Sequence, residues 1–146
     1  MKKFNFPLQK VLDYRKQLLE VERNKLKLIN AKILDIEQKR MELNIEYEIK
    51  NSQFEEDAKN GLPAMEYQTR RGYLASLLEK DSELLYLLKT IKKQQEEQTK
   101  VVIKFNQNVL ILERLKDKKI EEYDKDILKD AEKMIDEFVN SKKFNK

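Results

Sequence analysis

Carboxylates are the side chains of this protein best able to do chemistry, because its 146 residues include no histidine and no cysteine. Adjacent acidic pairs, such as Glu55–Glu56 and Glu121–Glu122, supply the residue types that a general acid and a general base require. Adjacent residues on a helix do not face each other, so such a pair cannot hold one substrate between its carboxylates. We therefore interpret the pairs as solvated surface and predict no catalytic residue and no enzymatic activity.

The residue types needed for other chemistry are also missing. Without histidine and cysteine the chain cannot form disulfides, thiolate nucleophiles or the zinc sites that those residues build. The sequence has no glycine-rich phosphate loop and no nucleophile elbow. We expect no metal site, no cofactor and no small-molecule substrate.

The charge of the chain is mildly basic and well mixed. There are 31 basic and 27 acidic residues, which gives a formal net charge of +4. A nucleic-acid-binding protein concentrates basic residues on one face or tail. The basic pairs here are scattered among acidic residues: Lys2–Lys3, Arg70–Arg71, Lys92–Lys93 and Lys118–Lys119. We expect no nucleic acid as a partner. Steeply salt-dependent binding of DNA or RNA would contradict this expectation.

Hydropathy gives no membrane segment in the sequence. No apolar run approaches the roughly 18 residues that a membrane-spanning helix requires. The first residues lack the continuous apolar segment of a secretory signal. We expect a cytoplasmic protein.

The elements that position these side chains are predicted to be two long helices. Charged and hydrophobic residues each make up 40% of the chain, a balance typical of helices that bury only a narrow stripe. Asn5 suits an N-cap, and Pro7 suits the first turn of one helix. Gly61 suits the left-handed residue that ends it, and Pro63 suits the first turn of the next.

The predicted fold is all-α: a long antiparallel two-helix coiled-coil hairpin with unequal arms. It forms one domain over 1–146, with helices at about 6–58 and 63–139 and a turn at about 59–63. Gly72 is the one glycine inside a helical pattern, and we expect it to weaken the second helix by about 1 kcal/mol relative to alanine.

Apolar residues recur in alternating steps of three and four, as in a left-handed coiled coil. The predicted seam of the first helix is Leu8, Leu12, Arg15, Leu19, Glu22, Leu26, Ile29, Ile33, Ile36, Arg40, Leu43, Tyr47, Lys50 and Phe54. That of the second is Tyr73, Leu77, Lys80, Leu84, Leu87, Ile91, Gln94, Gln98, Val101, Phe105, Asn108, Leu112 and Leu115. After Leu115 the register slips by one residue and resumes at Ile120, which indicates a stutter.

Two features of these seams allow more than one interpretation. The polar seam residues favour a role in fixing the register, and the alternative is local looseness, concentrated in residues 92–100. Residues 73–91 carry more apolar side chains than a two-helix seam needs. They form either a locally wide core or an exposed docking patch near the hairpin tip.

The longer arm leaves apolar residues without an intramolecular partner. If the turn lies near Gly61, residues after about 119 extend beyond the first helix as an overhang to about 140. An exposed apolar stripe normally has a partner, so we interpret the overhang as a recognition helix that inserts into another protein. The alternatives are a frayed end and self-association in a scaffolding homodimer.

Three segments together resemble the FliJ family, the small coiled-coil component of the flagellar type III export apparatus. They are FNFPLQKVLDYRKQLLEVERNKL near the start, NGLPAMEYQTRRGYLASLLEKDSELL at the predicted tip, and ERLKDKKIEEYDKDILKDAEKMIDEF near the end. The resemblance implies a protein similar in architecture to the stalk of rotary ATP synthases. It implies binding in the hole of the hexameric export ATPase, which promotes assembly and activity of that ATPase.

The resemblance also implies further partners and sites. A second partner is the cytoplasmic linker of the membrane export gate, and the ATPase regulator and export chaperones are additional ones. The implied location is peripheral, at the cytoplasmic face of the membrane at the flagellar base. Tyr73, Leu77 and Leu84 match the family positions for gate binding, whereas Lys80 departs from that pattern. The residues expected at the ATPase-facing end are Tyr123, Ile127, Met134, Asp136, Glu137 and Phe138.

Overall fold

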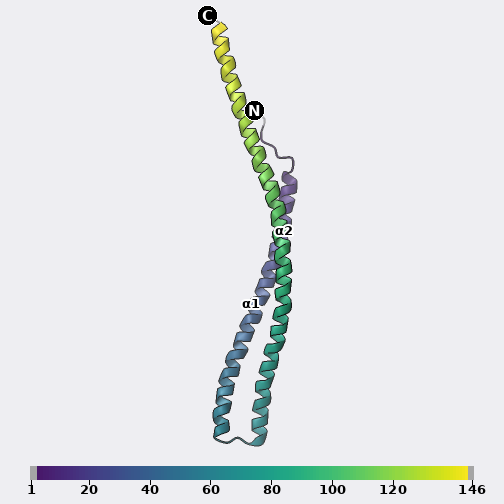
Figure 1. Ribbon diagram of the computed structural model, residues 1–146, viewed down its shortest axis with the longest axis vertical. Coiled ribbons are helices and arrows are strands. Elements are labelled where there is room, and N and C mark those ends of the chain that lie inside the picture. The colour runs from purple at the N-terminus through teal and green to yellow at the C-terminus, as the bar shows by residue number, and fades with distance from the viewer. Residues whose placement is uncertain (1–2, 145–146) are drawn as a thin grey trace. The chain divides into compact units, whose positions relative to one another are not determined.

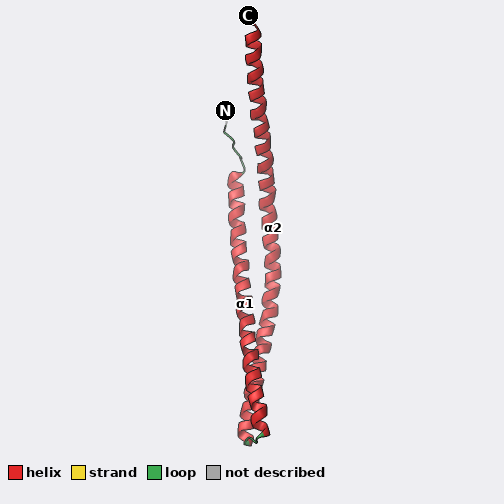
Figure 2. Ribbon diagram, turned by 90° about the vertical axis from the view of Figure 1, so that its left-hand side faces the viewer, coloured by secondary structure: helices red, strands yellow, loops and turns green. Residues whose placement is uncertain are grey.

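The computed structural model describes residues 3–144 as two helices, α1 (Gln9–Lys59) and α2 (Ala64–Phe144), of 51 and 81 residues. A short turn joins them (Figure 1). The described part of the chain contains no strand (Figure 2). The two helices pack against each other in opposite directions, so the predicted all-α hairpin is confirmed.

The turn follows the chemistry of its glycine and proline. Gly61 has a φ of 91°, the left-handed region that glycine adopts without a steric penalty. Its N–H donates to the carbonyl of Ala58 at 3.2 Å. The carbonyl of Pro63 accepts from the N–H of Tyr67 at 2.9 Å, so Pro63 precedes α2 as its cap and the helix begins one residue later than predicted.

The start of α1 also differs from the prediction. The N–H of Gln9 donates to the carbonyl of Phe6 at 3.0 Å, which closes a turn before the helix begins. The ring of Phe6 is buried, and this burial holds the turn in place. The helix therefore begins at Gln9 and not at about residue 6.

Contacts divide the chain into two compact units. One consists of residues 1–21 and 103–146, and the other of residues 22–102. The described core of the first unit contains Phe6, Leu12, Leu19 and Val109, of which Leu12 is the most completely buried. Burying one such aliphatic side chain contributes about 1.5–3 kcal/mol.

The second unit has its own core between α1 and α2. Ile33 and Ile36 of α1 pack with Leu88 and Ile91 of α2, and the half-buried side chains of Ile29 and Leu84 cover this cluster. Leu74 and Leu77 are buried nearer the turn. In the same stretch of α2, Leu78, Tyr86 and Leu87 are exposed, so residues 73–91 contribute both to the core and to the surface.

The seam of α1 agrees with the predicted heptads from Leu12 to Tyr47, where every predicted position is buried or half-buried. The prediction fails at Lys50, which is exposed, because the seam shifts to Asn51 before it reaches Phe54.

The seam of α2 differs from the prediction by one residue at every second position as far as Gln94. Beyond Gln94 the predicted Val101, Asn108 and Leu115 are half-buried. Leu77, Leu84, Ile91, Gln98, Phe105 and Leu112 lie on it as predicted, but its other members are Leu74, Asp81, Leu88, Gln95, Val102 and Val109. Tyr73, Lys80, Leu87 and Gln94, which were predicted on the seam, are exposed. Adjacent apolar pairs such as Tyr73–Leu74 and Leu87–Leu88 fit either register, so periodicity does not separate the two.

Polar pairs between the helices select the observed register. The guanidinium of Arg40 donates two hydrogen bonds to the carboxylate of Asp81, from Nε at 2.9 Å to one oxygen and from Nη2 at 3.4 Å to the other. This forked geometry holds the pKa of Arg40 above its ordinary value. Because Arg40 needs an acidic residue opposite it, the seam passes through Asp81 and not through Lys80.

Candidate docking surfaces

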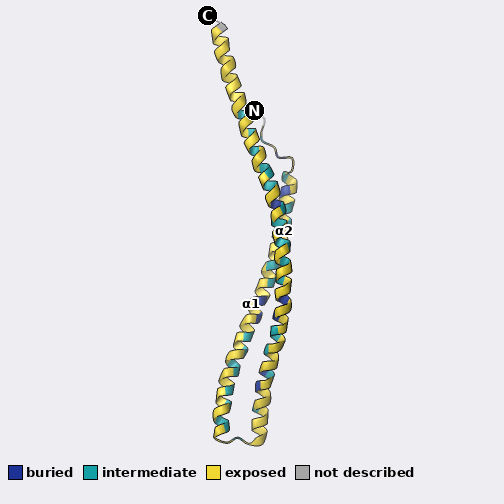
Figure 3. Ribbon diagram, in the orientation of Figure 1, coloured by how far each residue is buried: buried dark blue, intermediate teal, exposed yellow. Residues whose placement is uncertain are grey.

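The last part of α2 presents a broad uncovered apolar surface in the first unit. We define the C-terminal face as Ile127, Leu128, Met134, Ile135, Phe138 and Val139. At 100° per residue these positions span a sector of about 140° on the helix. All except the half-buried Ile127 are exposed, as Figure 3 shows along the end of α2.

The N-terminal segment decides where this uncovered surface begins. The ring of Phe4 meets the ring of Tyr123 edge-on, with centroids 5.6 Å apart and planes at 61°. Residues 3–8 are not helical, and a non-helical chain advances up to about 3.3 Å per residue compared with 1.5 Å in a helix. The segment therefore covers α2 as far as Tyr123, and the overhang begins after that residue and not at about 119.

Among the residues predicted to face the ATPase, the apolar ones lie on one side of α2 but differ in exposure, and the acidic ones lie elsewhere on the helix. Met134 and Phe138 lie on the C-terminal face and are exposed, whereas Tyr123 is half-buried beside Phe4. Asp136 and Glu137 are exposed on other sides of the helix. The prediction missed Leu128, Ile135 and Val139, although the doublets Ile127–Leu128, Met134–Ile135 and Phe138–Val139 were the available signal.

The three candidates for gate binding differ strongly in accessibility. Tyr73 is 43% exposed, whereas Leu77 is only 2% exposed and belongs to the core. Leu84 is half-buried against the cluster around Ile33. While the hairpin stays closed, the side chain of Tyr73 is the most accessible of the three, that of Leu84 is partly accessible and that of Leu77 is covered.

Tyr73 is held in place by α1. Its hydroxyl donates a hydrogen bond to the carboxylate of Glu46. That bond favours the neutral phenol, so it raises the pKa of Tyr73 above its ordinary value. The ring is therefore held by its polar end in a partly exposed position.

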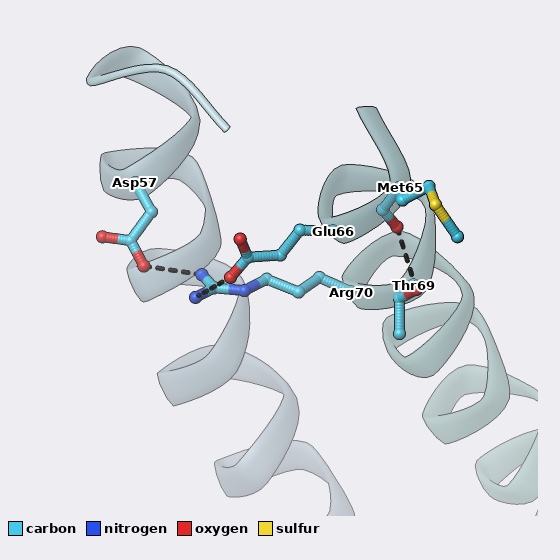
Figure 4. Close-up of polar contacts among 5 residues, drawn as sticks. All are labelled: Asp57, Met65, Glu66, Thr69 and Arg70. Carbon is cyan, nitrogen blue, oxygen red and sulfur yellow. Dashed lines mark hydrogen bonds and ion pairs between the residues drawn. The ribbon is translucent and has the colours of Figure 1, made fainter. Parts of the chain in front are cut away.

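Arg70 joins the two helices beside the turn. Its guanidinium donates to Asp57 of α1 at 2.6 Å and to Glu66 of α2 at 3.3 Å, as Figure 4 shows. These carboxylates, Asp57 foremost, hold the pKa of Arg70 above its ordinary value. At the same ends of the helices, the centroids of the Phe54 and Tyr67 rings lie 5.0 Å apart.

A hollow of about 410 Å³ lies between the helices next to Arg70. Phe54 and Tyr73 give it aromatic walls, and Lys50 and Arg70 give it positive charge. The sequence prediction placed Lys50 on the seam and so missed its place here.

Two other kinds of site are absent from the part of the chain that the structure describes. Within residues 3–144 there is no group of three or more acidic side chains placed to hold a metal ion. Within that range, too, neither helix contains a stretch apolar enough to cross a lipid bilayer.

Comparison with known proteins gives a match to a family model. The family model described as "Flagellar FliJ protein" matches residues 4–146, nearly the whole chain. No curated protein and no solved structure matches the chain.

Proposed function

Since the chain belongs to the FliJ family of flagellar proteins, with a role in flagellar protein export, we propose that it is the stalk of the hexameric export ATPase. In this proposal the end of α2 enters the central hole of the ring and promotes its assembly and activity. The observation that carries the proposal is the C-terminal face, whose apolar side chains, except the half-buried Ile127, are left exposed by the part of the chain that the structure describes.

The width of the C-terminal face supports a partner that surrounds the helix. A two-stranded coiled coil buries a narrower stripe than this sector of about 140°. A ring contacts a helix on all sides, so Met134 and Phe138 can pack on its wall while Asp136 and Glu137 face other subunits. Complete burial of each large apolar side chain contributes about 1.5–3 kcal/mol, and several together outweigh an association cost of about 4–15 kcal/mol.

The tip of the hairpin is proposed to contact the cytoplasmic linker of the membrane export gate. Tyr73 is the candidate with the best accessibility, because it is exposed and its ring is fixed by Glu46. Leu77 and Leu84 support this surface from beneath. The hollow lined by Phe54 and Arg70 adjoins Tyr73 and extends the surface that a gate segment could contact.

The proposal includes the wider role of the family. The chain would reside in the cytoplasm and associate peripherally with the membrane at the flagellar base through these partners. It would also contact the ATPase regulator and take part in recycling export chaperones.

The ATPase proposal is tested with the purified chain and its cognate export ATPase. We expect the chain to raise ATP hydrolysis and ring formation, and Met134→Glu with Phe138→Glu to abolish both effects. The matched control is Tyr86→Glu, which changes an equally exposed residue of α2 outside the C-terminal face. Absence of stimulation by the unaltered chain, or equal stimulation by both variants, would refute the proposal.

Gate binding is tested separately with the isolated cytoplasmic linker of the gate. We expect Tyr73→Ala to weaken binding at least about tenfold, which is about 1.4 kcal/mol. Tyr86→Ala, a second exposed tyrosine of α2, should bind like the unaltered chain.

A second candidate function is a homodimeric scaffold. The C-terminal face supports this candidate too, because two copies could bury that face against each other. Sedimentation separates the two functions. A 17.6 kDa monomer favours the stalk, whereas a tight dimer that Phe138→Glu dissociates favours the scaffold.

A further inference from the structure

The outer side of α1 carries a second stripe without charge in the second unit. We define the outer stripe as Ala31, Leu34, Gln38, Met41, Ile45 and Ile49. These residues recur in steps of three or four, the spacing that faces a neighbouring helix. Every one of them is exposed, and Leu34 is 67% exposed.

The outer stripe lies on the side of α1 opposite the hairpin core. At 100° per residue its middle is about 160° around the helix from Ile33, Ile36 and Leu43, which face α2. A helix that packs on one partner needs one apolar stripe, with polar residues on the other side. The second stripe therefore has no role in closing the hairpin.

Two surface hollows on this stripe have the outline of coiled-coil holes. One contains Met41, Asn44, Ile45 and Glu48, and has a volume of about 310 Å³. The other contains Glu42, Ile45, Glu46 and Ile49, and has a volume of about 350 Å³. Each set follows the spacing i, i+3, i+4, i+7, the four-residue diamond that receives one side chain of a facing helix. The stripe is thus shaped for a helix.

The rims of these hollows are acidic. Glu37 and Glu48 line the first hollow, and Glu42 and Glu46 line the second. Of the cations there, Arg40 is engaged by Asp81, and Lys50 beside the second hollow is outnumbered by Glu42 and Glu46. Among the residues that the structure describes, Glu42 and Glu48 have neither an ion pair nor a hydrogen bond. A helix that fills the hollows must therefore bring positive charge beside its apolar row.

A second copy of this chain does not meet that requirement. Pairing two outer stripes would place the rim carboxylates of one copy near those of the other, and like charges across a helix interface are destabilising. We propose that the outer stripe of α1 docks an amphipathic helix of another protein, one whose apolar row is flanked by lysine or arginine. This surface is distinct from the C-terminal face, and it adjoins the tip surface at Glu46, which also holds Tyr73.

The proposal is tested with a synthetic probe on the full chain. The probe is a helix of about four heptads with leucine in its apolar row and lysine on both flanks, and its matched partner has glutamate on the flanks. Because the chain contains no cysteine, a fluorophore can be attached through Gln38→Cys in the stripe or through Ser82→Cys on α2 as a control.

We expect the lysine probe to change the emission of the label at position 38 but not at position 82. The glutamate probe should bind at least about tenfold more weakly. Ile45→Glu, at an exposed position, should abolish binding of the lysine probe with unchanged helix content, whereas Tyr86→Glu should leave it intact.

Three outcomes would overturn the proposal. One is no response at position 38, and another is equal affinity for the two probes. The third is a dimer in sedimentation that Ile45→Glu dissociates, because a second copy would then occupy the stripe.

Discussion

Glu22 of α1 and Gln98 of α2 are joined across the hairpin by two hydrogen bonds from one nitrogen. Nε2 of Gln98 donates to the Glu22 carboxylate at 2.6 Å and to the Glu22 backbone carbonyl at 3.0 Å. Both residues were predicted to interrupt the seam. Their side chains form a specific polar contact within the seam. This contact supports a role for polar seam residues in fixing the register, rather than local looseness in this region.

This contact predicts a pH dependence of stability. The hydrogen bond from Gln98, followed by that from Lys25, holds the pKa of Glu22 below its ordinary value. A depressed folded pKa means that the stabilisation is complete above the unfolded pKa and is lost as pH falls through the folded value. We expect Glu22→Gln to lower the urea midpoint at neutral pH and to match the unaltered chain in acid.

The control for this experiment is Glu20→Gln, an exposed carboxylate two residues away that makes no contact with Gln98. Its urea midpoint should follow that of the unaltered chain at every pH. A difference between Glu22→Gln and the unaltered chain that stays constant from neutral to acid pH would contradict the assignment.

Leu77 and Tyr73 should separate stability from binding. Leu77 is buried, so Leu77→Ala should lower the free energy of unfolding by about 2–5 kcal/mol. Tyr73→Ala should lower it less, by about 0.5–1.5 kcal/mol, because this partly exposed side chain mainly loses its hydrogen bond to Glu46. Urea denaturation followed by circular dichroism measures both, and equal losses for the two variants would show that Tyr73 is also part of the core.

Gly72 offers a stabilising substitution. A Cβ at this position meets no atom within 4 Å, and its φ is not positive. Gly72→Ala should raise the free energy of unfolding by about 0.5–1 kcal/mol. Gly61→Ala is the matched control and should lower it, because the φ of 91° at Gly61 strains any residue with a Cβ. Thermal melts of the two variants should therefore move in opposite directions.

Hydrogen exchange should distinguish the two ends of α2. Amides of residues 77–91 lie in a packed helix, whereas residues 128–143 are all exposed and open by local fluctuation. We expect the second group to exchange much faster in the free chain and to become protected in the presence of the export ATPase. Equal protection of the two groups in the free chain would mean that the C-terminal face is already covered.

Much of the fold could be predicted because few residues break the helices. Gly61 and Pro63 place the turn, and the seam of α1 is readable because residues such as Ile33 and Ile36 have polar neighbours. The register of α2 could not be predicted from apolar periodicity. The doublets Tyr73–Leu74 and Leu87–Leu88 fit two registers equally, and the deciding contact joins Arg40 to Asp81, a pairing between residues 41 apart in sequence.

The candidate sites were less predictable for the same reason. Periodicity indicates which residues share a face but not how far a neighbouring segment reaches. Tyr123 was predicted to be uncovered, and Phe4 contacts it because the N-terminal segment is not helical. Leu77 was predicted both as a seam residue and as a gate contact, and the structure shows it in the core.

The continuity of α2 has a consequence for how its end can meet a partner. Starting a helix is the unfavourable step, because several backbone angles are fixed before the first hydrogen bond forms, whereas each added residue gains one bond. Residues after Tyr123 propagate from a helix that the hairpin has already nucleated. A free peptide with their sequence would have to nucleate alone and would melt into an ensemble of coils. The hairpin therefore acts as a template that delivers this segment already wound.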